Sequence, residues 1–251
     1  MKKITILILL FALTQSIFSQ IKDCSKCDSK NYFEKDINHL TLLELKILRN
    51  EIFARHQYIF ENDRLKDYFL ERYDWYKPDY KSKNKIELNN FEQENSSLFL
   101  KKENEKITLK KTIIEKLKVF KQALINKDTI TTNSSISKFV TDNEYVNLSA
   151  IRKELKEILT SINIDGIHWY NERGLFKVTT DDGHFLNETS VTINGSRVIV
   201  QYAGIGHSEL LKDETAFSFG SDFYSVNEYQ SWYTFEIQNN KLILIKHQAA
   251  G

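Results

Sequence analysis

The sequence has almost no excess of either charge, because its 35 Lys and Arg residues are balanced by 34 Asp and Glu residues, which gives a formal net charge of +1. Nucleic-acid binding needs a basic face, so this balance excludes any electrostatic reason to expect a nucleic-acid partner. Beyond residues 4–13 the chain also lacks a second long apolar run, and a transmembrane helix needs about 20 apolar residues. With 41% hydrophobic and 12% aromatic residues, the chain can still form a globular core.

The first 20 residues have the pattern of a cleavable bacterial signal peptide. Lys2 and Lys3 precede an apolar run over residues 4–13, and small or polar residues follow it directly. We expect cleavage after Ser19 or Gln20, with an uncleaved membrane anchor as the alternative. Cleavage predicts an exported chain, periplasmic or secreted, with no membrane span after its removal.

Cysteine is scarce, since Cys24 and Cys27 are the only two, spaced C-x-x-C just after the expected cleavage site. In an oxidising envelope a local disulfide is the favoured state, and a free thiol pair and a metal site are the alternatives. A zinc site would need two further ligands, for which His39 is the only nearby candidate. We therefore expect a disulfide and no metal.

Apolar residues at helical spacing predict helices in the first two thirds of the chain. Thr41 and Glu44 form the T-x-x-E pattern of a capping box, ahead of a helix that runs to about His56. A second helix is predicted after a cap at Asn62 or at the residue that follows it. Further helices are predicted over about 87–101, 113–124 and 151–159.

From Ile167 the period of the apolar residues changes to two, which predicts an antiparallel sheet. Asn194-Gly195 and Asn239-Asn240 separate alternating runs and suit hairpin turns. The chain is therefore predicted to be α+β. A small all-helical domain spans 34–101, a charged linker 102–110, and a helix-plus-antiparallel-sheet domain 111–251. Helices followed by a curled sheet are similar to the NTF2-like cone, whose mouth would be the default pocket.

Residues 42–78 read L-x-x-L-x-x-L-R-N-E-I-F-A-R-H-Q-Y-x-F, then L-x-x-Y-F, then W-Y-x-P. This pattern resembles the YARHG domain, a family of presumed extracellular bacterial modules. The motif that gives the family its name runs here from Phe53 to Gln57 and differs from the family at both ends. Phe53 lacks the hydroxyl of the family's tyrosine. Gln57 replaces a glycine, which would favour ending the helix at a residue with positive φ. The family has no established molecular activity, although members accompany peptidases and kinases. The resemblance therefore implies a location outside the cytoplasm and does not imply a reaction.

The first predicted helix places polar residues among its apolar ones. At 100° per residue, Arg49 and His56 fall within the apolar stripe, and Arg55 lies at its edge. Asn50 and Glu51 fall outside the stripe and are expected to be exposed. A buried guanidinium needs acceptors, which carboxylates or carbonyls of the following segment could supply.

Two interpretations of these residues remain open. In the first, they form a buried polar network that fixes three short helices, and this is favoured because such networks specify small cores more often than they catalyse. In the second, they line a cleft in which Arg49 or Arg55 binds a carboxylate and His56 transfers protons. Trp75 and Tyr76 also have two possible roles: core and rim residues, which is favoured because aromatics supply much of a small domain's burial, or part of a sugar-stacking face. These five residues are the candidate binding site, and no catalytic residue is predicted.

Motifs of catalytic sites are absent from the sequence. Residues 204–208 read G-I-G-H-S, which is not the G-x-S-x-G of a nucleophile elbow, and no H-E-x-x-H occurs. Residues 181–183 read D-D-G and predict a turn, since a calcium site would need further oxygens at fixed spacing. We therefore expect no cofactor and favour a non-enzymatic binding or interaction module for a cell-wall or envelope protein ligand. The alternative is a hydrolase or isomerase with a pocket in the C-terminal domain.

Overall fold

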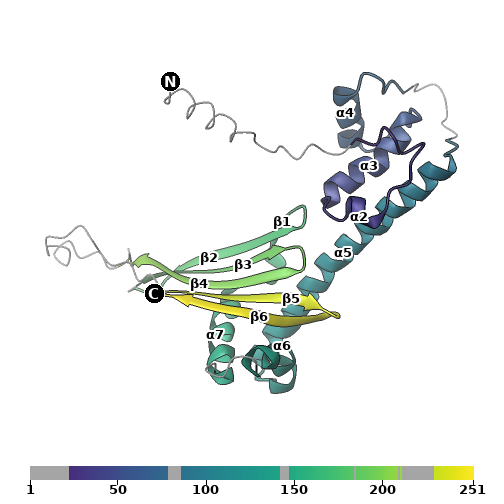
Figure 1. Ribbon diagram of the computed structural model, residues 1–251. Coiled ribbons are helices and arrows are strands. Elements are labelled where there is room, and N and C mark those ends of the chain that lie inside the picture. The colour runs from purple at the N-terminus through teal and green to yellow at the C-terminus, as the bar shows by residue number, and fades with distance from the viewer. Residues whose placement is uncertain (1–22, 79–85, 142–146, 184, 209, 211–228) are drawn as a thin grey trace, which may run out of the picture. The chain divides into compact units, whose positions relative to one another are not determined.

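The structure is a computed structural model that describes residues 23–78, 86–141, 147–183, 185–208, 210 and 229–251 (Figure 1). The expected signal peptide at 1–20 lies outside these residues. Within them, six α-helices and one six-stranded antiparallel sheet form an α+β protein, as predicted. The chain divides into two compact units, Met1–Leu100 and Lys101–Gly251.

The first unit contains three helices and the beginning of a fourth: α2 (Glu34–Ile37), α3 (Leu42–Arg55), α4 (Asp63–Arg72) and α5 (Asn90–Ile125). Helix α3 begins with the predicted capping box, in which the Thr41 hydroxyl accepts a hydrogen bond from the Glu44 backbone N–H and the Glu44 carboxylate accepts one from the Thr41 N–H. The Asn62 side chain caps α4 by accepting a hydrogen bond from the Leu65 N–H. Both predicted helix starts are confirmed.

Helix α3 is buried on more than one side, and this overturns part of the helical-wheel prediction. It contributes to two apolar clusters of the first unit. One consists of Cys24, Cys27, Ile37, Leu40, Leu45, Leu48, Ile52 and Phe99, and the other of Ile47, Ala54, Phe60, Phe69 and Tyr76. Because α3 packs in both, Asn50 and Glu51 are only 8% and 0% exposed, and the expectation that they face solvent is wrong.

Helix α3 ends at Arg55, and the next two residues form its stop. His56 is the C-cap residue, and Gln57 has φ +60°, the left-handed conformation that the family's glycine would adopt without strain. The Gln57 side chain bridges to the segment after α4: its Nε2 donates to the Trp75 carbonyl at 3.0 Å and its Oε1 accepts from the Lys77 N–H at 2.6 Å. These hydrogen bonds offset the strain of a side chain at this position.

Residues 102–110, predicted to be a linker, lie within α5. The helices predicted over 87–101 and 113–124 are therefore parts of one helix, which begins at Asn90. The charged residues of this segment have helical spacing, because Lys102 Nζ lies 3.0 Å from the Glu105 carboxylate at i, i+3. The two compact units divide inside α5, between Leu100 and Lys101.

The second unit adds α6 (Thr129–Thr141), α7 (Leu148–Ser161) and a 3₁₀ turn (Ile164–Gly166) to the end of α5. Helix α6 was not predicted, because its sequence is rich in Thr and Ser. Asp128 caps it, with Oδ1 accepting hydrogen bonds from the N–H groups of Ile130 and Thr131.

The sheet is a simple meander with the order β1-β2-β3-β4-β5-β6, and all neighbours are antiparallel. Its strands are β1 (His168–Tyr170), β2 (Arg173–Asp181), β3 (Phe185–Asn194), β4 (Arg197–His207), β5 (Gln230–Gln238) and β6 (Lys241–Ala250). Both predicted hairpins are present, with Gly195 at φ +59° in one and Asn239 and Asn240 at φ +47° and +60° in the other. Figure 1 shows α6 and α7 on one face of the sheet.

The face of the sheet towards the helices changes character along its length. At one end its inward side chains are apolar and form the main core with α5, α6 and α7; they include Val191, Ile193, Val198, Val200, Phe235 and Leu244. Towards the other end the inward positions are polar, namely Thr180, Asn187, Thr189, Tyr202, Ser231 and Tyr233. The comparison with the NTF2-like cone stays a prediction.

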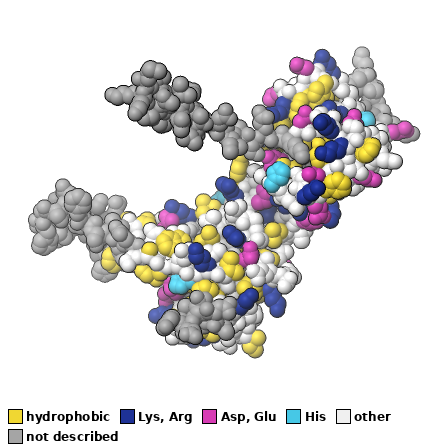
Figure 2. Space-filling model, viewed as in Figure 1, with side chains coloured by type: hydrophobic (Ala, Val, Ile, Leu, Met, Phe, Trp, Pro, Cys, Tyr) yellow, Lys and Arg dark blue, Asp and Glu magenta, His cyan; other side chains and the backbone are white. Residues whose placement is uncertain are grey.

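Figure 2 shows basic and acidic side chains interspersed over the visible face of both units, in keeping with the near-neutral composition. In the part of the chain that the structure describes, no helix combines the length and the apolar character that a membrane crossing requires.

Candidate functional site

Arg55, a predicted binding residue, pairs with two carboxylates of its own unit. Its Nη2 lies 2.6 Å from Glu51 Oε1 and 2.9 Å from Asp23 Oδ1. The Glu51 side chain is 0% exposed, and its second oxygen accepts a hydrogen bond from the Cys24 N–H at 3.2 Å. Burial raises the pKa of Glu51 despite the hydrogen bond from Arg55. Burial alone would also raise the pKa of Asp23, but hydrogen bonds with Glu51 and Ser25 and the Arg55 charge lower it.

The Arg55 guanidinium also lies over an aromatic ring. Its Cζ is 4.9 Å from the centroid of the Trp75 ring, a cation–π geometry. The neighbouring Tyr76 is 2% exposed and donates its hydroxyl to the Tyr58 carbonyl at 2.6 Å. Arg49 is half-buried on α3 and has interaction partners as well. Arg55, Trp75 and Tyr76 are therefore engaged within the unit.

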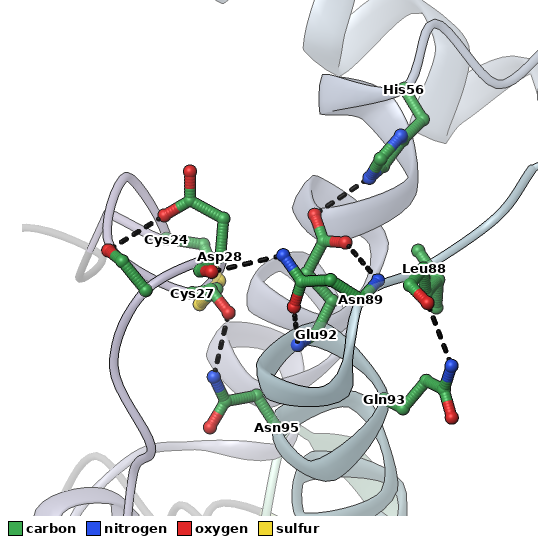
Figure 3. A network of polar contacts seen from close by, with 10 residues as sticks. Cys24, Cys27, Asp28, His56, Leu88, Asn89, Glu92, Gln93 and Asn95 are labelled. Carbon is green, nitrogen blue, oxygen red and sulfur yellow. Dashed lines mark hydrogen bonds and ion pairs between the residues drawn. A yellow bond between two sulfur atoms is a disulfide. The ribbon is translucent and has the colours of Figure 1, made fainter.

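His56 is placed differently from the helical-wheel prediction. Because α3 ends one residue earlier, His56 lies at the C-cap and its side chain is 33% exposed, not enclosed in the apolar stripe. Its Nε2 lies 2.7 Å from the Glu92 carboxylate (Figure 3). Glu92 in turn accepts a hydrogen bond from the Asn89 N–H, while its own N–H donates to the Asn89 side chain, the reciprocal pattern of a capping box. His56 thus connects the end of α3 to the start of α5.

Cys24 and Cys27 form a disulfide, and both are buried. Asn95 of α5 holds the loop that contains them, because its Nδ2 donates to the Cys27 carbonyl at 3.0 Å (Figure 3). The same Nδ2 donates to the Lys30 carbonyl at 2.8 Å, and Oδ1 accepts from the Tyr32 N–H at 2.8 Å. One buried amide therefore satisfies three backbone groups of the loop.

Three of the five candidate residues thus belong to two polar networks. Arg55 and Trp75 form one with Glu51 and Asp23, and His56 forms the other with Glu92. Sequence reasoning missed Glu51, Glu92 and Asn95. The only available signal was the N-x-x-E spacing from residue 89 to 92, which marks the start of a helix.

A second candidate site is a cavity of about 540 Å³ in the second unit. It lies between α7 and the polar end of the sheet, and it falls within the usual size range of ligand pockets. Its lining residues are Glu154, Glu157, Ile158 and Ser161 of α7, Thr180, Asn187, Thr189 and Tyr202 of the strands, and Asp182 and Tyr229 beside them.

Glu154 is the hydrogen-bonding centre of this cavity. One of its oxygens accepts from the Ser231 hydroxyl, and the other accepts from the Tyr233 hydroxyl at 2.7 Å. Burial and the hydrogen bond to Glu154 raise the pKa of Tyr233, and burial with nearby carboxylates raises the pKa values of Tyr202 and Tyr229. These three hydroxyls therefore stay protonated around neutral pH and act as fixed hydrogen-bond donors.

His247 lies on β6 beside this centre. Its ring stacks on Tyr233, with centroids 4.3 Å apart, and its Nε2 is buried without a hydrogen-bond partner among the described residues. Burial lowers the pKa of His247, although the Glu154 charge acts in the opposite direction. A neutral ring is thus favoured near pH 7. Among the described residues no cluster of three or more His, Cys, Asp or Glu side chains could hold a metal ion.

The family model of the YARHG domain matches residues 22–104. The match covers the motif and confirms the resemblance of the N-terminal third of the chain to this presumed extracellular domain. No curated protein and no solved structure matches the chain.

Proposed function

We propose, from the YARHG domain and the cavity that lies outside it, that the chain is an exported envelope protein that binds a ligand in its C-terminal unit. In this proposal the YARHG domain is an interaction module for the cell wall or for an envelope protein, and its polar residues chiefly maintain its fold. A buried disulfide just after the expected cleavage site suits an oxidising compartment.

The observation that carries the proposal is the cavity of about 540 Å³. Arg55, His56 and Tyr76 of the first unit are engaged in contacts with neighbouring protein groups, whereas the cavity combines free volume with convergent polar groups. The titratable hydroxyls around it have pKa values raised away from neutrality, which suits fixed hydrogen-bond donors better than proton-transfer groups.

Two neighbouring threonines of β2 provide the test. Both are exposed, but Thr180 lines the cavity and Thr179 lies on the opposite face of the sheet, because successive side chains of a strand alternate. Thr180→Trp should fill the cavity, and Thr179→Trp should leave it open. We expect a small-molecule extract of the envelope to raise the melting temperature of the wild type and of Thr179→Trp but not that of Thr180→Trp. Equal shifts in both variants would refute binding in the cavity.

A hydrolase or isomerase is the second candidate, and the observation in its favour is the position of Glu154 beside the cavity with two hydroxyls on its carboxylate. In such an enzyme Glu154 would act as the general base. The test is conversion of the bound compound, followed by mass spectrometry with wild type and Glu154→Gln. Unchanged compound after long incubation with wild type supports binding alone, and turnover abolished by Glu154→Gln supports the enzyme.

A further inference from the structure

The cavity of the second unit has a one-sided charge. Three of its lining residues are carboxylates, namely Glu154, Glu157 and Asp182, and none of the described lining residues is Lys, Arg or His. Glu154 is partly buried and is therefore less screened than a carboxylate on an open surface, whereas Glu157 and Asp182 are exposed. The cavity is therefore electrostatically unfavourable for an anion and favourable for a cation.

The hydrogen-bonding groups of the lining lead to the same conclusion. The Tyr202 hydroxyl donates to Asn187 Oδ1 at 2.6 Å, and Asn187 Nδ2 donates to Asp182 Oδ2 at 3.0 Å. The Ser161 hydroxyl donates to the Ile158 carbonyl at 2.8 Å. These donors are satisfied within the protein, while carboxylate oxygens keep lone pairs for further bonds. A ligand that fits must supply donors or positive charge.

Two aromatic rings complete the lining. The centroids of Tyr202 and Tyr229 are 6.3 Å apart and their planes are inclined by 50°. A cation in the angle between the rings can lie within about 6 Å of both centroids, the range in which the negative ring faces attract it. Aromatic faces beside carboxylates are the usual surroundings of a bound ammonium group.

From the charge, the satisfied donors and the two rings together, we propose that this cavity binds an organic ammonium ion. The inference rests on the proposed binding function and specifies the chemistry of its ligand. The ammonium group lies against Tyr202 and Tyr229, and the carboxylates of Glu157 and Asp182 balance its charge. A cavity of about 540 Å³ leaves room for an attached chain of several carbon atoms.

The test is calorimetric titration of the mature protein with two probes of the same size. Choline carries a quaternary ammonium group, and 3,3-dimethylbutan-1-ol is its neutral isostere; putrescine serves as a primary diamine. We expect choline or putrescine to bind at least about tenfold more tightly than the neutral isostere, and the binding to weaken as NaCl is raised.

Two variants connect this binding to the cavity. Tyr229→Leu should weaken binding of the ammonium probe about tenfold, because it removes one aromatic face. Glu157→Gln removes one charge from an exposed position and should weaken it less. Glu71→Gln, an equal change on the exposed side of α4, is the matched control and should leave binding unchanged.

The outcomes separate this inference from the proposed function. If neither choline nor putrescine bound more tightly than the neutral isostere, the ammonium assignment would be overturned. If an envelope extract still stabilised the wild type and Thr179→Trp but not Thr180→Trp, the proposed function would stand and only the ligand class would be wrong. If Thr180→Trp bound every ligand as the wild type does, both would fail.

Discussion

The contact between Arg55 and Glu51 gives the most specific stability prediction for the YARHG domain. The Glu51 carboxylate is fully buried, and its hydrogen bonds come from Arg55 and from the Cys24 N–H. Arg55→Ala would leave this carboxylate with the Cys24 N–H and would remove the ion-pair partner of Asp23, which is already 59% exposed. Removing one partner of a buried ion pair costs about 3–5 kcal/mol. Because the Arg55 side chain is 30% exposed, we expect the lower end, about 3 kcal/mol at pH 7.

The loss of stability caused by Arg55→Ala should depend on pH. Burial raises the pKa of Glu51 above its ordinary value of 4.5. A carboxyl whose pKa is raised on folding binds its proton more tightly in the folded state, so its contribution to stability is fully present below about pH 4.5 and is lost as the pH rises through the folded pKa. Loss of the Arg55 charge should raise this pKa further. Arg55→Ala should therefore be less destabilising at pH 5 than at pH 7.

The assay is urea unfolding of the mature chain, followed by hydrogen exchange of peptides from α3 so that the first unit is observed separately. Glu51→Gln and the double variant complete a mutant cycle, in which the double variant should be more stable than Arg55→Ala alone. We expect a coupling energy of about 1–3 kcal/mol. If Arg55→Ala were as stable as the wild type, or lost the same free energy of unfolding at pH 5 and pH 7, the stabilising role of the Arg55–Glu51 contact would be refuted.

Three further predictions concern the same unit. Gln57→Ala should lower the free energy of unfolding by about 1–3 kcal/mol, because two hydrogen bonds are lost. Gln57→Gly should be about 1 kcal/mol more stable than Gln57→Ala, because glycine adopts the left-handed conformation without strain. Equal urea midpoints of the two variants would contradict the strain at position 57. Arg49→Ala should lower the melting temperature, whereas Lys46→Ala, a change at an exposed position of the same helix, should alter it little. If Arg49→Ala kept the wild-type melting temperature but lost ligand binding, Arg49 would be a recognition residue. Asn95→Ala should cost about 2–4 kcal/mol and speed hydrogen exchange in residues 27–32, and unchanged exchange there would contradict its role.

Local signals predicted the starts of the helices and the hairpins. Each of these signals depends on residues that are close together in the sequence, so it can be recognised without the tertiary structure. They are the T-x-x-E capping box before α3, the Asn62 cap of α4 and the Asn239-Asn240 turn. The charged stretch from Lys101 to Lys106 was interpreted as a linker because it is apolar-free. Its Lys–Glu spacing at i, i+3 and i, i+4 equally suits a helix, and the structure has a helix there.

The burial of Glu51 could not be predicted from a helical wheel. The wheel assumes one buried stripe, whereas α3 takes part in two apolar clusters at different angles around its axis. Its partner Asp23 and the Cys24 N–H come from a loop some 27 residues earlier in the chain, and no pattern within α3 indicates them.

The cavity of the second unit combines α7 with the three strands β2, β3 and β4, so its lining depends on tertiary packing. A weak signal was nevertheless present. Thr189, Tyr202, Ser231 and Tyr233 occupy inward positions of their strands where apolar residues would continue the core. Polar residues at the alternating positions of a strand that face the core indicate either a hydrogen-bonded network or a pocket. Only the placement of α7 decides between the two.

Binding of the ligand in the C-terminal unit can be tested by NMR chemical-shift mapping with a small-molecule envelope extract. We expect the largest amide shifts at the cavity, around Asn187, Thr189 and Tyr202, and no shifts in the first unit. Shifts concentrated around Arg55 and Trp75, with the cavity unchanged, would contradict this expectation and would make the YARHG domain the ligand-binding site.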